Sequence, residues 1–146
     1  MKKQEKAVTY FRNKFNCSQS VLTVFGSDYG ISENDCLKIA CAFGGGMGRQ
    51  QYTCGAVTGA LLVLGLNYGK ALNDPEEKKD VTYSKAREFF KEFEILHGST
   101  VCRDLLDGLD LNDPGDHQKI VDLKLFDIKC EKYITDAVNI IERFMK

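Results

Sequence analysis

The residues best suited to chemistry lie in one stretch, where a glycine-rich segment leads into a helix whose first turn holds a cysteine. Residues 44–48, Gly-Gly-Gly-Met-Gly, predict a loop, because each glycine costs about 1 kcal/mol in a helix relative to alanine. Cys54 follows at the expected start of an apolar helix over 54–68, with Thr53 as its expected cap. The N–H groups and the dipole at a helix start favour a thiolate, and Arg49 adds a positive charge nearby. Such surroundings lower a cysteine pKa from about 8.5 into the range 3.5–7.5 and make the thiol reactive.

The glycines have both a binding and a structural interpretation. Gly55 and Gly59 place a bare backbone stripe on one helix face, which admits a cofactor or a packed chain segment. If this region binds a ligand, the candidate residues are Gly44, Gly45, Gly46, Gly48, Arg49, Gly55 and Gly59. No Gly-Lys-Ser/Thr follows as in a Walker A motif, and Arg49 replaces the third glycine of a dinucleotide fingerprint. In the structural interpretation, the loop is only a flexible connection and Cys54 is a small buried hydrophobic residue.

Three further cysteines, Cys17, Cys102 and Cys130, lie at expected helix starts or on apolar helix faces. Taken singly, each is explained by core packing. Cys36 and Cys41 do not share a helix face and are expected to be structural. No CxxC pair is present, so the spacing supports neither a thioredoxin-like motif nor a zinc finger. Any site that uses these thiols must therefore be assembled from distant helices.

Composition indicates one globular domain over 1–146. The chain is 43% hydrophobic and 28% charged, which is ordinary for a folded protein. Its 20 basic and 21 acidic residues leave a net charge of −1, which does not favour a nucleic-acid partner. The first residues lack the apolar region of a signal peptide, and the longest apolar stretch is too short to span a membrane. We therefore expect a cytoplasmic protein without membrane insertion, in which clustered cysteines indicate redox chemistry or metal binding.

Hydrolase chemistry has no support, since no Ser-His-Asp, HExxH or paired-carboxylate pattern is present. His97 lies near an expected helix end, where its imidazole could act as a base, as a metal ligand or as a cation. We expect it to be a cation that interacts with the helix C-terminus.

Hydrophobic periodicity predicts successive helices. The predicted helix starts are marked by capping residues at Asn16 or Ser18, Ser32, and Ser99 or Thr100, and by the pairs Asp74-Pro75 and Asp113-Pro114. The predicted helix ends lie at Gly30, Gly69, Gly98 and Gly108. The last expected helix begins near Cys130. We predict an all-α fold, a compact single-domain multi-helix bundle around the central apolar helix 54–68.

The segment Cys-Gly-Ala-Val-Thr-Gly at 54–59, with one cysteine upstream and two downstream, resembles the C-GCAxxG-C-C family of bacterial and archaeal proteins classed as redox-active. The resemblance covers nearly the whole chain and includes segments 44–49 and 101–106. It implies that the four family cysteines, which are Cys17, Cys54, Cys102 and Cys130, act together. Cys36 and Cys41 fall outside the family pattern.

The leading hypothesis is a thiol-disulfide oxidoreductase in which Cys54 is the acidic nucleophile and another family cysteine resolves the mixed disulfide. Its partner would be a redox protein or a small thiol. The alternative is a binding protein in which the same four thiolates, Cys17, Cys54, Cys102 and Cys130, hold an iron–sulfur cluster or zinc. A third interpretation is a helical interaction module without chemistry. From the family pattern we predict that these four cysteines converge in space while Cys36 and Cys41 stay outside.

Overall fold

The computed structural model describes residues 1–145, and the fold is all-α, as the sequence predicts. The α-helices are α1 (Lys3–Arg12), α2 (Cys17–Gly26), α3 (Glu33–Ala40), α4 (Gly55–Tyr68), α5 (Glu77–His97), α6 (Cys102–Leu105), α7 (Pro114–Asp122) and α8 (Glu131–Phe144). Short helical turns are η1 (Ser27–Tyr29), η2 (Cys41–Phe43) and the π-helical η3 (Phe126–Cys130). Within 1–145 no strand forms, and one isolated antiparallel bridge joins Thr53 to Val101.

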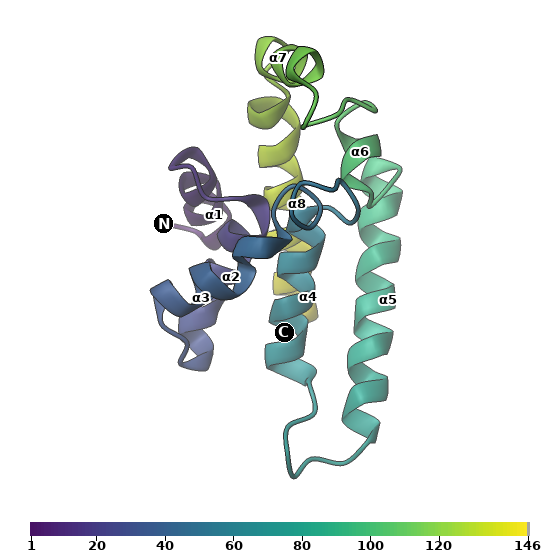
Figure 1. The fold of residues 1–146 in the computed structure, drawn as a ribbon. Helices are drawn as coiled ribbons and strands as arrows, with labels where there is room; N and C mark the ends of the chain where they lie inside the picture. The colour runs from purple at the N-terminus through teal and green to yellow at the C-terminus, as the bar shows by residue number, and fades with distance from the viewer. Residues whose placement is uncertain (146) are drawn as a thin grey trace.

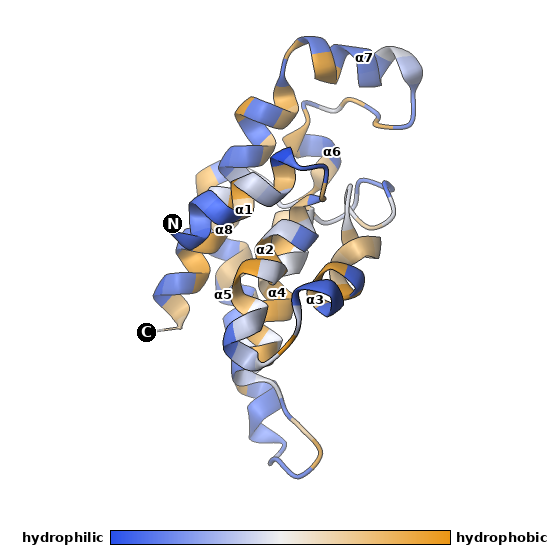
Figure 2. Cartoon of the chain, turned by 90° about the vertical axis from the view of Figure 1, so that its left-hand side faces the viewer, coloured by the Kyte–Doolittle hydropathy of each residue, from blue (hydrophilic) through white to orange (hydrophobic). Residues whose placement is uncertain are grey.

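Helix α4 occupies the centre of the bundle and contacts α2, α5 and α8 (Figure 1). Helices α4 and α5 run side by side and are joined by the loop at the bottom of Figure 1, while α6 and α7 lie toward the opposite end. Hydrophobic residues are concentrated along α4, whereas α3 and α7 are largely hydrophilic (Figure 2). An apolar helix with neighbours on several sides is what burial in a bundle core requires. The predicted central helix is therefore confirmed.

Several predicted helix boundaries are confirmed by their caps. The Asn16 side chain accepts from the Gln19 N–H while the Gln19 side chain accepts from the Asn16 N–H, which forms a capping box. Ser32 caps α3, and Asp113 caps α7, which has a proline in its first turn. Gly98 ends α5 with φ of +81°, a conformation that favours glycine.

Three predicted boundaries are wrong. Cys54, not Thr53, is the N-cap of α4, because Thr53 is held in the bridge to Val101. Helix α5 begins at Glu77, so Pro75 lies in the preceding turn. Helix α6 is capped by neither Ser99 nor Thr100: its N-cap is Val101, whose N–H donates to the Ser99 hydroxyl at 2.9 Å.

Helices α4 and α2 pack closely against each other at two glycines of α4. A Cβ at Gly59 would lie 2.9 Å from the Ser18 carbonyl oxygen and 3.0 Å from Val21 Cβ. A Cβ at Gly55 would lie 3.0 Å from Cys17 Cβ. Real Cβ atoms essentially never lie as close as the Gly59 contact, so Gly59 is required for the two helices to pack at this distance, and a side chain at Gly55 would force a small shift of α2.

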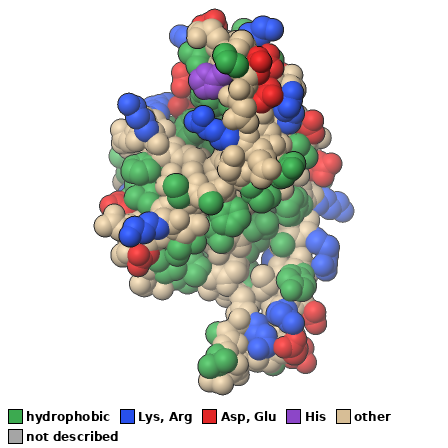
Figure 3. Space-filling model, in the orientation of Figure 1, with side chains coloured by type: hydrophobic (Ala, Val, Ile, Leu, Met, Phe, Trp, Pro, Cys, Tyr) green, Lys and Arg blue, Asp and Glu red, His purple; other side chains and the backbone are tan. Residues whose placement is uncertain are grey.

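The core consists of two adjoining hydrophobic clusters. The larger surrounds α4, and Phe89, Phe93, Leu22, Leu64 and Ile134 are among its fully buried side chains. The smaller is formed by Cys102, Leu106, Leu111, Ile120, Leu125 and Cys130. On the face shown in Figure 3, hydrophobic side chains occupy the middle and charged ones gather toward the edges. No helix within 1–145 is long and apolar enough to cross a membrane.

We expect Gly59→Ala to destabilise the protein by about 1–3 kcal/mol, although alanine favours helix formation, because the added methyl overpacks the α2–α4 contact. Gly65→Ala is the matched control, since nothing lies within 4 Å of a Cβ at Gly65 in the same helix. It should stabilise the protein by roughly 0.5–1 kcal/mol. Urea unfolding curves measure both changes, and equal effects of the two variants would contradict the packing argument.

Candidate functional site

The four family-type cysteines meet at the end of the bundle where their helices begin. Cys17 is the first residue of α2, Cys54 is the N-cap of α4, Cys102 is the first residue of α6, and Cys130 directly precedes α8. All four line one cavity of about 740 Å³. Cys54, Cys102 and Cys130 are buried, whereas Cys17 is half-buried, and all four are free thiols. Residues far apart in the chain thus share one site.

Cys17 interacts with the other three cysteines of this set. The neighbouring Cys130, together with burial, raises the pKa of the Cys17 thiol well above its ordinary value. Cys17 in turn adds to the effect of burial in raising the pKa of Cys54 and of Cys102.

Burial opposes the effect of the helix start at Cys54. The N–H groups of Ala56 and Val57 lower the pKa of the Cys54 thiol, as expected at a helix N-terminus. Burial and the neighbouring Cys17 outweigh them and raise that pKa above its ordinary value. The prediction that Cys54 is an acidic thiol is therefore wrong for the folded protein. Burial likewise raises the pKa of Cys102 to about 12.

The glycine-rich segment is a tight left-handed turn, not the flexible connection of the structural interpretation. Residues 45–49 all have positive φ, between 61° and 72°. Backbone bonds close the turn, such as Arg49 N–H to the Gly44 carbonyl at 3.1 Å. Left-handed geometry costs about 1–2 kcal/mol for each residue with a Cβ, here Met47 and Arg49. A Cβ at Gly46 would lie 2.8 Å from Cys102 Cβ, so the turn packs directly on this cysteine.

Most of the candidate binding residues line the cavity. Gly44, Gly45, Gly46, Gly48, Arg49 and Gly55 belong to its wall. Gly59 does not, because its face is covered by Ser18 and Val21 of α2. A Cβ at Gly44 would lie 2.3 Å from the Asn16 side chain, so this glycine admits the cap of α2. Several of these glycines therefore serve packing around the cysteines.

The sequence analysis missed the opposite wall of the cavity. It is formed by residues before α2 and around η3, which are Phe11, Arg12, Lys14, Phe15, Phe126, Asp127, Glu131 and Tyr133. Arg12 forms a two-pronged ion pair with Glu131, at 3.0 and 2.8 Å. No sequence motif marks these residues.

Tyr133 connects the cysteines to a buried charged group. Its hydroxyl donates to the Leu105 carbonyl at 2.7 Å, and burial, together with Cys130, raises its pKa. The His97 ring packs edge-on against Tyr133, with 4.8 Å between the ring centroids. His97 Nε2 lies 2.9 Å from Oδ2 of the buried Asp136, which also pairs with Lys132. Burial lowers the pKa of His97, so the neutral form is favoured instead of the predicted cation.

The remaining two cysteines differ in position. Cys36 is buried in the larger core cluster, and a Cβ at Gly26 would overlap its sulfur. Cys41 is exposed and lies on the cavity wall, where its carbonyl accepts from Asn16. Only Cys36 is thus remote from the cavity that the four cysteines share.

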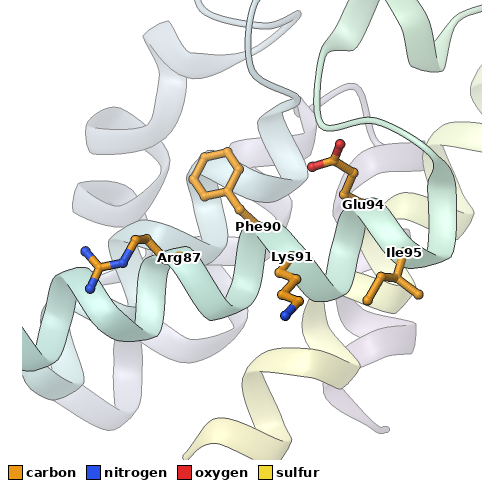
Figure 4. Close-up of a pocket in the computed structure, with 5 residues that line it drawn as sticks. All are labelled: Arg87, Phe90, Lys91, Glu94 and Ile95. Carbon is orange, nitrogen blue, oxygen red and sulfur yellow. The ribbon is translucent and has the colours of Figure 1, made fainter.

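Neither a metal-ligand cluster nor the other hollow of the described residues provides an alternative site for thiol chemistry. Within residues 1–145, no group of three or more Cys, His, Asp or Glu side chains is arranged to hold a metal ion. A second hollow of about 520 Å³ lies on α5 and is lined by Arg87, Phe90, Lys91, Glu94 and Ile95 (Figure 4). It shares no residue with the cysteine cavity and contains no thiol. The cysteine cavity is therefore the candidate redox site.

Comparison with known proteins agrees with the geometry. The family model described as "Putative redox-active protein (C_GCAxxG_C_C)" matches residues 15–144. The chain is also similar to a protein of Archaeoglobus fulgidus named "Uncharacterized protein", at 28% identity over 117 residues, which cover 75% of this chain and 78% of the relative. No solved structure matches the chain significantly. The matched range contains Cys17, Cys54, Cys102 and Cys130.

We expect the free energy of unfolding to fall as the pH rises above about 8.5, the ordinary thiol value of the unfolded chain. The unfolded state then releases protons that buried Cys102 retains until about pH 12. Each such thiol contributes a slope of up to about 1.4 kcal/mol per pH unit. Urea unfolding between pH 7.5 and pH 10.5 measures the slope, which Cys102→Ser should reduce. Cys41→Ser removes an exposed thiol and should leave it unchanged; equal slopes in parent and Cys102→Ser would contradict the argument.

Proposed function

The chain belongs to the C_GCAxxG_C_C family, and from this premise we propose that it is a thiol–disulfide redox protein whose reacting groups are the cysteines of the 740 Å³ cavity. The observation that carries the proposal is the meeting of Cys17, Cys54, Cys102 and Cys130 around that cavity. Thiols that exchange disulfides must reach one another and a partner sulfur, and a shared cavity provides both.

The contact between Cys17 and Cys130 marks the first pair to be oxidised. Cys130 is the neighbour with the largest effect on the Cys17 thiol, and both residues line the cavity. When the pair loses one proton to solvent, one sulfur becomes a thiolate next to a second thiol. That arrangement resembles the nucleophile and resolving thiol of exchange reactions.

The reaction is a two-electron oxidation. A thiolate attacks one sulfur of an acceptor disulfide, and the acceptor S–S bond breaks as a mixed disulfide forms. The second cysteine then attacks the protein sulfur of that mixed disulfide. The products are one protein disulfide and two acceptor thiols, which take up the two protons that the cysteines lose.

Cys54 and Cys102 complete the site as a second dithiol, in which both thiols are buried. Their raised pKa values keep them protonated near neutral pH. They become available when the first pair has been oxidised, because Cys17 can exchange its disulfide with either neighbour. Helix starts at Cys17 and Cys54 stabilise the thiolate formed in each step.

The test is a serine scan of the four positions. The anaerobically purified protein is equilibrated with oxidised and reduced dithiothreitol, and disulfides are counted by peptide mass spectrometry. We expect one disulfide, between Cys17 and Cys130, to form first in the parent. Cys17→Ser and Cys130→Ser should each abolish it, while Cys54→Ser and Cys102→Ser should leave it intact.

Cys41→Ser is the matched control, since it removes an exposed thiol from the same cavity wall. It should retain the disulfide. The rival function is binding of an iron–sulfur cluster or zinc by the four thiolates. Stoichiometric iron or zinc in the parent, lost equally in all four serine variants, would overturn the proposal in favour of that function, because each ligand of such a site supports the others.

A further inference from the structure

We propose that the electron acceptor of this site is a low-molecular-weight disulfide that carries carboxylate groups and enters the cysteine cavity. The inference rests on the thiol–disulfide function proposed above. It adds the size and the charge of the partner, which neither the family description nor the cysteine pattern specifies.

The burial of the thiols excludes a large acceptor. Cys54, Cys102 and Cys130 are 4%, 8% and 7% exposed. A disulfide held in a folded protein is surrounded by backbone, which hinders its approach to thiols this buried; the half-buried Cys17 must also react together with buried Cys130. A small disulfide can enter, because about 740 Å³ lies within the roughly 300–1,000 Å³ typical of small-molecule sites.

The charges on the cavity wall favour an anion. Arg12 is neutralised by its ion pair with Glu131. Lys14 and Arg49 are exposed, and within residues 1–145 neither side chain makes an ion pair or a hydrogen bond to another residue. Asp127 is the remaining acid of the wall, so cations exceed acids by one. A guanidinium is well suited to a carboxylate, to which it can bind with two parallel hydrogen bonds.

The uncharged part of the wall suits the rest of such a molecule. Phe11, Phe15 and Phe126 add aromatic surface to the same cavity wall. A disulfide with short methylene arms can place its carboxylates near Lys14 and Arg49 and its sulfurs inside. Attack by one cysteine then releases half of the molecule as a thiol, attack by the second releases the other half, and the protein retains the new disulfide.

The experiment compares two small disulfides of similar size and opposite charge, 3,3′-dithiodipropionate and cystamine, with insulin as a protein disulfide. The rate of protein oxidation is followed by mass spectrometry. The variants are Arg49→Asn and Lys14→Asn, since asparagine tolerates the left-handed backbone at both positions. Lys124→Asn is the matched control: Lys124 also has positive φ and is exposed but does not line the cavity.

We expect the ratio of the dithiodipropionate rate to the cystamine rate to fall about fivefold in Arg49→Asn and in Lys14→Asn, and to stay unchanged in Lys124→Asn. Because this ratio is compared between each variant and the parent, the different intrinsic reactivities of the two reagents cancel. Insulin should react more slowly than either. An unchanged ratio in both cavity variants, or insulin as the fastest acceptor, would overturn this inference while the thiol function stands. A parent protein that forms no disulfide with any of the three acceptors or with oxidised dithiothreitol would overturn both.

Discussion

The site depends on one steric constraint, the contact between the start of α2 and the first turns of α4. With glycine at 55 and 59, the Cys17–Ser18 backbone can lie directly against α4. Cys17 then faces the N-cap position of α4, where Cys54 stands. A larger residue at either glycine would move α2 outward and carry Cys17 away from Cys54 and the cavity. The glycines of the CGAxxG segment are therefore explained by helix packing around thiols.

The electrostatics of the site are a balance between helix starts and burial. The N–H groups at the start of α4 favour a thiolate at Cys54, but removal from water favours the thiol, and burial is the larger effect. Burial also raises the pKa of Cys102. Both Cys54 and Cys102 are thereby held in the less reactive thiol form.

The glycine-rich wall of the cavity is anchored by a polar residue that the sequence did not mark. Buried Gln51 donates to the Leu109 carbonyl and accepts from the Leu111 N–H, both at 2.8 Å. It thereby ties the left-handed turn at 45–49 to the segment after α6. The strain in that turn is maintained because the surrounding contacts determine its shape, as is common at functional sites.

The sequence alone determined the all-α fold, the central apolar helix, and the caps at Asn16, Ser32 and Asp113, because periodicity and capping are local properties. The family pattern also selected four of the cysteines that line the cavity, but not Cys41. Only the tertiary structure decided the surroundings of their thiols. Whether a thiol at a helix start is acidic depends on how much water the rest of the fold excludes from it, and that burial reversed the prediction for Cys54. The proximity of Cys17 to Cys130, like the shared cavity wall of Lys14 and Arg49, joins residues distant in the chain, and no local pattern encodes such pairs.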